Sequence, residues 1–324
     1  MNRLQALKSS PQKVVYRRPT FWKRLLWEFK HNHALYVLVL LPLVILILFR
    51  YVPMYGVQIA FRNYKAVHGV NGSEWVGLKY FVKFFTSINC WPLIRNTLSI
   101  NLYSLATFPL ALILALLLNY IPSHRYRKTV QLVSYAPHFI STVVMCGMLL
   151  QFLDVRTGMI NEVLKIFGIE PINFMGTPSY FYDIYVWSGV WQSLGYSSIM
   201  YTAALAGISP DLHEAAVVDG ANIIQRIWHV DIPGVLPTFC ILLIMRTGSI
   251  LNIGYEKILL LQNNLNKPIS DVIATYTYQI GLNSSGIPQY SYGAAIGLFS
   301  NIINMAILLL VNNITKRLSG NGLF

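Results

Sequence analysis

The chain has 324 residues, of which 55% are hydrophobic and only 11% are charged, and its mean hydropathy is +0.50. Soluble domains carry about 25% charged residues, so the composition excludes an ordinary water-soluble fold and indicates an integral membrane protein. The net charge of +13 would suggest nucleic-acid binding in a soluble protein, but eight lysines and arginines fall within the first 30 residues, ahead of any apolar run. The positive-inside rule explains such a tail, so we expect residues 1–33 to be a cytoplasmic basic tail and expect no nucleic-acid partner.

Six apolar runs are long enough to cross about 30 Å of hydrocarbon. They cover residues 35–51, 97–120, 130–153, 184–205, 235–253 and 293–314. The first run lacks a small-residue cleavage site, which favours an uncleaved helix over a signal peptide. The pattern predicts an all-α, polytopic protein of about six transmembrane helices, with one transmembrane domain over residues 34–324.

The orientation of this domain follows from the basic residues beside the spans. With the N-terminus inside, the links 121–129 and 206–233 and the C-terminal tail are predicted to be cytoplasmic, and lysines and arginines near these ends agree. Residues 53–96 are a partial misfit, because they are assigned outside yet carry five lysines and arginines. We expect short interfacial helices there and an amphipathic helix over residues 158–167.

Three widely spaced cysteines and scattered histidines fit neither a disulfide framework nor a metal site. We therefore expect no bound metal, and we expect Cys90, Cys146 and Cys240 to be packing residues.

The link 206–233 is more structured than a simple connection. Ser209 can serve as a helix N-cap, with Pro210 at the first helical position and Asp211 near the positive end of the helix dipole, so a helix is predicted to start here. Gly220 is predicted to end this helix in the left-handed conformation.

A second helix is predicted to follow Gly220, with four apolar residues on one face. These residues are Ile223, Ile224, Ile227 and Trp228. The resulting helix-turn-helix is either a docking surface for another protein or an amphipathic hairpin that lies on lipid headgroups.

The same link resembles the signature loop of bacterial ATP-binding-cassette importer permeases. Glu214-Ala215-Ala216, then Gly220, then Val230-Asp231-Ile232-Pro233 keep the spacing of that loop, which usually ends in Ile-x-Leu-Pro. The resemblance covers residues 35–324 and points to the carbohydrate permeases of the lipoprotein-complex and maltose-related group. Further similar segments are residues 51–56, 95–98, 135–141, 203–208 and 320–324.

The resemblance implies a type I importer in a bacterial inner membrane. Its expected partners are a second, different permease subunit, two ATPase subunits that bind ATP and Mg²⁺, an external solute-binding protein, a saccharide and the lipid bilayer. It also implies a coupling helix that sits in a cleft of the ATPase and switches the cavity between inward and outward access. The residues assigned to it are Glu214, Ala215, Ala216, Asp219, Gly220 and Ala221. The chain has no phosphate-binding Gly-Lys-Ser/Thr loop, so we expect no catalytic residue and no cofactor of its own.

Polar residues within the spans are candidates for the substrate pathway, because they are costly in hydrocarbon. These are Trp187, Trp191, Gln192 and Tyr196 on the fourth span and Arg246, Ser249 and Asn252 on the fifth. Aromatic faces suit sugar rings, but small polar residues also serve helix packing. Arg246 has two interpretations, a partner for an acidic residue of the second permease or a contact for an anionic saccharide.

Two other functional classes compete with the importer. A secondary transporter or channel not coupled to ATP would need intramembrane carboxylates or broken helices, and the six runs contain no Asp or Glu. A membrane enzyme would need a catalytic acid, base or metal near one interface, and the acidic residues outside the runs form no such motif.

Overall fold

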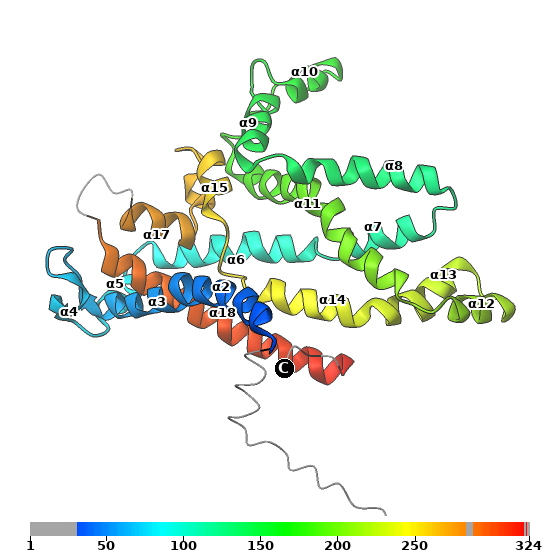
Figure 1. Cartoon of the computed structure of the whole chain (residues 1–324). Coiled ribbons are helices and arrows are strands. Elements are labelled where there is room, and N and C mark those ends of the chain that lie inside the picture. The colour runs from blue at the N-terminus through cyan, green and yellow to red at the C-terminus, as the bar shows by residue number, and fades with distance from the viewer. Residues whose placement is uncertain (1–30, 283–287, 321, 323–324) are drawn as a thin grey trace, which may run out of the picture. The chain divides into compact units, whose positions relative to one another are not determined.

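The computed structural model describes residues 31–282, 288–320 and 322. Residue contacts divide the chain into two units, Met1–Val57 and Gln58–Phe324. Most of the predicted basic tail, residues 1–30, lies outside the described residues. The described residues are helical apart from turns and two very short strands (Figure 1).

The first unit is built around one apolar helix whose winding changes along its length. α2 (His33–Leu46) passes into a π-helical turn η1 (Ile47–Tyr51) and then α3 (Val52–Met54), and the 3-10 turn η2 (Tyr55–Phe61) continues into the second unit. Residues Ala34–Phe61 are long and apolar enough to cross a membrane. The span predicted at residues 35–51 is therefore confirmed by length and composition.

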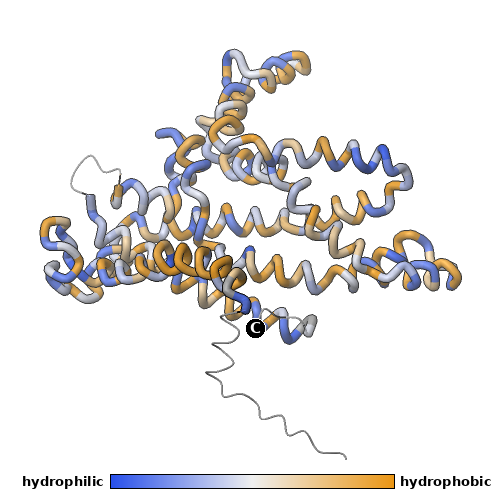
Figure 2. Tube along the Cα trace, in the orientation of Figure 1, coloured by the Kyte–Doolittle hydropathy of each residue, from blue (hydrophilic) through white to orange (hydrophobic). Residues whose placement is uncertain are grey.

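Three helical segments of the second unit meet the same criteria. α6 (Cys90–Ala106) and α7 (Leu110–Asn119) together form Cys90–Asn119, and α14 (Ile232–Thr247) is continuous with α13 (Ile223–Arg226) and the π-helical turn η5 (Ile227–Asp231). The third segment is α18 (Tyr290–Ser319). Apolar residues recur along all three in Figure 2, as a lipid-facing helix requires.

The span predicted at residues 130–153 is interrupted by a sharp bend. α8 (His124–Tyr135) and the 3-10 turn η3 (Ala136–Phe139) are followed by α9 (Thr142–Phe152), and the two parts meet at a bend of 97°. Pro137 lacks the N–H that a continuing helix needs, and the Ser141 hydroxyl accepts a hydrogen bond from the Val144 N–H at 3.3 Å. The chain therefore ends one helix and starts another where hydropathy alone indicates a single span.

α11 (Phe181–Ala206) corresponds to the fourth predicted span and contacts α7, α8 and α14. It has 26 residues, but its serines, glycines and glutamine keep it from being as apolar as the other spans. Within the described residues, four helices qualify as spans by length and composition, or five if the bent pair counts as one, against six predicted.

The region predicted to hold short interfacial helices contains α4 (Gly69–Gly72), α5 (Lys79–Phe85) and an antiparallel pair of strands, β1 (Arg62–Asn63) and β2 (Glu74–Trp75). Its basic residues make specific contacts. The Arg62 guanidinium donates to the Ser73 carbonyl at 3.0 Å and lies over the Trp75 ring. The Lys83 ammonium donates to Gln289 at 2.8 Å. Local packing thus accounts for two of the charges that fitted the positive-inside rule poorly.

The other segments between the long helices are also short helices. They are α10 (Met159–Ile166), η4 (Pro178–Tyr180), α15 (Tyr255–Leu261), α16 (Lys267–Ser270) and α17 (Ile273–Gly281). α10 confirms the helix predicted at 158–167. Before it, hydrogen bonds from the backbone N–H groups of Thr157 and Arg156 lower the pKa of Asp154, because they stabilise its charged form.

Buried amides join segments that are far apart in the sequence. Asn96 on α6 donates to the carbonyls of Pro268 and Asp271 at 3.0 and 2.9 Å. Asn304 on α18 accepts from the Leu251 N–H at 2.9 Å. These bonds satisfy polar groups away from water and fix the connections between helices.

Candidate functional site

The first candidate site is α12 (Pro210–Val218), which begins and ends as the sequence predicts. The Ser209 hydroxyl accepts from the Asp211 N–H at 3.3 Å, and Pro210 occupies the first turn. Gly220 has φ +79°, its N–H donates to the Val217 carbonyl at 3.0 Å, and the Ala221 N–H donates to the Ala216 carbonyl at 2.9 Å. These two bonds are the Schellman pair that closes a helix C-terminus.

A second capped helix follows at once. The Asn222 side chain accepts from the Gln225 N–H at 2.9 Å, while the Gln225 side chain accepts from the Asn222 N–H at 2.8 Å. The N-cap of this capping box, Asn222, stands two residues after Gly220, and α13 begins at the next residue. The predicted second helix is therefore present, and it runs without interruption through η5 into α14.

Most of α12 is exposed within this chain. None of its residues is buried, and Val218 is 87% exposed. The side chains of Glu214, Ala215 and Asp219 are exposed, and so is Gly220, whereas Ala216 and Ala221 are half-buried. On α13 and η5, Ile223, Ile224 and Trp228 are also exposed. Figure 1 shows α12 and α13 beyond one end of α14. Together they present small and apolar side chains on a rigid, capped support.

The second candidate site is an open pocket of about 530 Å³ lined by three helical segments. α6, α7 and the link between them form one side, α11 another and α14 the third. Hydroxyl groups are abundant in its lining. The residues with hydroxyls are Ser104, Thr107, Tyr185, Ser193, Tyr196, Ser197, Tyr201 and Ser249.

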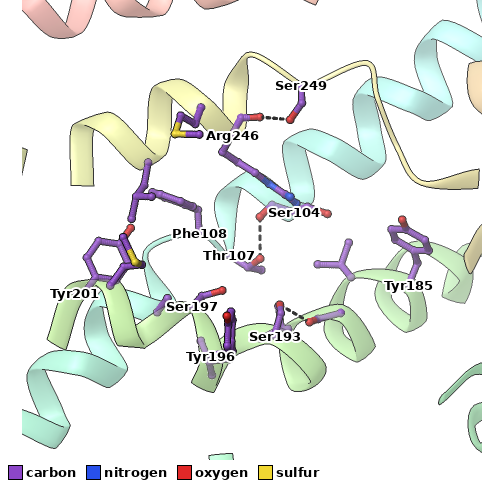
Figure 3. Close-up of a pocket in the computed structure, with 18 residues that line it drawn as sticks. Ser104, Thr107, Phe108, Tyr185, Ser193, Tyr196, Ser197, Tyr201, Arg246 and Ser249 are labelled. Atoms are coloured by element: carbon purple, nitrogen blue, oxygen red, sulfur yellow. Dashed lines mark hydrogen bonds between the residues drawn. The ribbon is translucent and has the colours of Figure 1, made fainter. Parts of the chain in front are cut away.

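Arg246 supplies a positive charge in this pocket. Its side chain extends from α14 toward Ser104 on α6 (Figure 3). Within the described residues its guanidinium forms no salt bridge or hydrogen bond, and Ser249 bonds only to its carbonyl. Arg246 stands in the last turn of α14, at the end of the apolar segment Ile223–Thr247, and its side chain is exposed in this chain.

Only some of the substrate-pathway residues predicted from the sequence line the pocket. Tyr196, Arg246 and Ser249 line the pocket, whereas Trp187, Trp191, Gln192 and Asn252 do not. The Gln192 amide donates to the Ile140 carbonyl at 2.7 Å, so it joins α11 to the bend between α8 and α9.

The indole of Trp187 is engaged outside the pocket. Its N–H donates at 2.9 Å to the Tyr103 hydroxyl, which in turn donates to the Asp183 carboxylate at 2.7 Å. Sequence reasoning missed most of the hydroxyl lining of the pocket, because serine and threonine on an apolar helix also indicate packing.

The described residues contain no group of three or more histidine, cysteine or acidic side chains that could hold a metal ion. The three cysteines are free and buried.

These features define a class: a polytopic helical membrane protein with a polar pocket between its helices and a rigid helix-turn-helix at one end of a span. The chain belongs to the family of inner membrane components of binding-protein-dependent transport systems, whose model matches residues 107–320. This membership favours an ATP-driven importer subunit over a secondary transporter, channel or membrane enzyme.

Individual relatives match almost the whole chain. It is 37% identical over 303 residues to YteP, a polygalacturonan/rhamnogalacturonan transport system permease of Bacillus subtilis strain 168, covering 93% of this chain and 94% of that protein. The protein LplB of the same organism is 37% identical over 91% of this chain and 92% of its own length.

A solved structure has the same fold. A bacterial alginate transporter, crystallised with a periplasmic protein that holds an alginate pentasaccharide, contains a chain with 36% identity and a TM-score of 0.84. The match covers 93% of this chain and all of that one.

Proposed function

We propose that this chain forms part of the translocation pathway for an acidic oligosaccharide that an external binding protein delivers. The observation that carries the proposal is Arg246, an unpaired guanidinium in a pocket lined with hydroxyls. A guanidinium binds carboxylates through charge-assisted hydrogen bonds, and hydroxyls match the ring substituents of a sugar. The descriptions of two relatives support an acidic substrate: one structure is of a bacterial importer of the acidic polysaccharide alginate, and YteP belongs to a polygalacturonan/rhamnogalacturonan transport system.

The energy for transport would come from partner subunits. In this proposal the α12 helix docks into an ATPase subunit through Glu214, Ala215 and the Gly220 turn, and a second permease completes the pathway. ATP and Mg²⁺ would bind to the ATPase subunits, and this chain would have no ATPase site of its own. In this proposal the 206–233 link and both termini lie in the cytoplasm. Two features support docking at α12. The helix is exposed, and it is capped at both ends, which makes it rigid enough to transmit movement from the ATPase.

The substrate proposal is tested by replacing Arg246 in the complete transporter. In proteoliposomes, Arg246→Gln is expected to raise the concentration needed for half-maximal uptake of an acidic tetrasaccharide by about tenfold, since one charge-assisted hydrogen bond contributes about 1.5–3 kcal/mol. Uptake of any neutral tetrasaccharide that the wild type carries should change little, and Arg246→Lys, which keeps the charge, should lose less. Unchanged uptake of the acidic saccharide by Arg246→Gln would refute the assignment.

A further inference from the structure

Asp231 is a fully buried carboxylate in the turn that leads from the helix-turn-helix into α14. Its exposed fraction is 0%, and the Tyr120 hydroxyl at the end of α7 donates to its Oδ2 at 2.6 Å. The Arg226 guanidinium lies over the ring of the same tyrosine, 5.4 Å from its centre. The carboxylate is thus held between the ends of two long helices.

The second oxygen of Asp231 faces α12. Oδ1 has no hydrogen-bond partner, and the Nε2 of His213 on α12 lies 3.6 Å away. A buried carboxylate with an unsatisfied oxygen costs free energy, and an imidazole N–H at this position offsets part of that cost. A small movement of α12 toward α14 would bring the Nε2 of His213 within hydrogen-bond distance of the Oδ1 of Asp231.

The contact matters because α12 has few other attachments. It buries none of its own residues, and His213 is only 25% exposed at the side chain, whereas its sequence neighbours Leu212 and Glu214 are exposed. His213 is therefore the polar residue of α12 that faces the long helices.

We propose that Asp231 is a positioning residue that joins α12 to α7 and α14, so that movement of α12 is passed to helices that line the pocket. Tyr120 holds the carboxylate from α7 and His213 reaches it from α12. The inference rests on the proposed docking of an ATPase to α12. Loss of the linkage should leave docking intact and weaken the transmission of movement, which is a coupling free energy between two sites.

The test compares variants of the complete transporter in proteoliposomes, with ATP hydrolysis and uptake measured on the same samples. Asp231→Asn and His213→Ala are expected to keep the ATPase subunits bound and to lower the sugar transported per ATP hydrolysed by about fivefold or more. His213→Gln, whose amide can donate to Oδ1, should retain at least about half of the wild-type ratio. Asp231→Asn added to His213→Ala should cause little further loss, because both remove the same link.

The proposed linkage is wrong if the sugar transported per ATP hydrolysed stays at the wild-type value in Asp231→Asn and in His213→Ala. It is also wrong if His213→Gln lowers this ratio as much as His213→Ala does. If Asp231→Asn fails to assemble, the two His213 variants still test the linkage. The His213 side chain is partly exposed, so these variants should still fold. Glu214→Arg separates the two proposals. If it leaves the ATPase subunits bound, docking at α12 fails; if it releases them while the His213 variants transport normally, only the linkage fails.

Discussion

Replacing Gly220 by proline is expected to abolish coupled transport while the protein still inserts into the membrane. Gly220 has φ +79°, a region that proline cannot enter because its ring fixes φ near −65°. Proline would also remove the N–H that donates to the Val217 carbonyl. α12 would then lose its C-terminal closure, and the direction in which α13 leaves the turn would change. We expect uptake to fall at least about tenfold, with copurification of the ATPase subunits reduced.

A matched variant at the same position distinguishes the effect of the backbone angle from the effect of adding a side chain. A Cβ at Gly220 would have no atom of this chain within 4 Å, so within the chain only the backbone angle is strained. Asparagine adopts the left-handed region more readily than other residues with a side chain. Gly220→Asn should therefore keep most of the uptake of the wild type. Full uptake by Gly220→Pro would exclude the turn as a part of the coupling mechanism.

The caps of α12 could be predicted from the sequence because they depend on residues within four positions of each other. Ser209, Pro210 and Gly220 determine the backbone locally, and the tertiary structure does not override them. The bend at Ile140 had a local signal as well, in Pro137 and Ser141. Hydropathy concealed it, because the residues on both sides are apolar.

The pocket could not be predicted in the same way. Its lining comes from three helical segments, and which side of each helix faces the others depends on packing between distant residues. Trp191 and Tyr196 are equally plausible sugar contacts by chemistry, yet only Tyr196 lines the pocket. Arg246 was identifiable because a charge in an apolar span is rare, whatever its surroundings. Asp231 was predicted only as part of the motif, and its complete burial could not be predicted because it depends on packing against Tyr120 and α12.

Replacing Gly195 by alanine is expected to lower the stability of the protein strongly. Gly195 lies on α11 where this helix contacts α8, and a Cβ there would overlap the carbonyl oxygen and carbon of Ser134. Both atoms belong to the backbone, so no side-chain rotation relieves the overlap and the two helices must separate. Overpacking of this kind costs about 1–3 kcal/mol, and occasionally more.

Gly195→Ala should therefore lower the midpoint of thermal unfolding in detergent by several degrees and reduce the yield of monodisperse protein. Gly297→Ala on α18 is the control, since a Cβ there meets nothing within 4 Å and alanine favours the helix over glycine. Equal midpoints for the two variants would contradict close packing of α11 on α8. A selective loss of stability in Gly195→Ala would instead assign this glycine to the packing of α11 on α8.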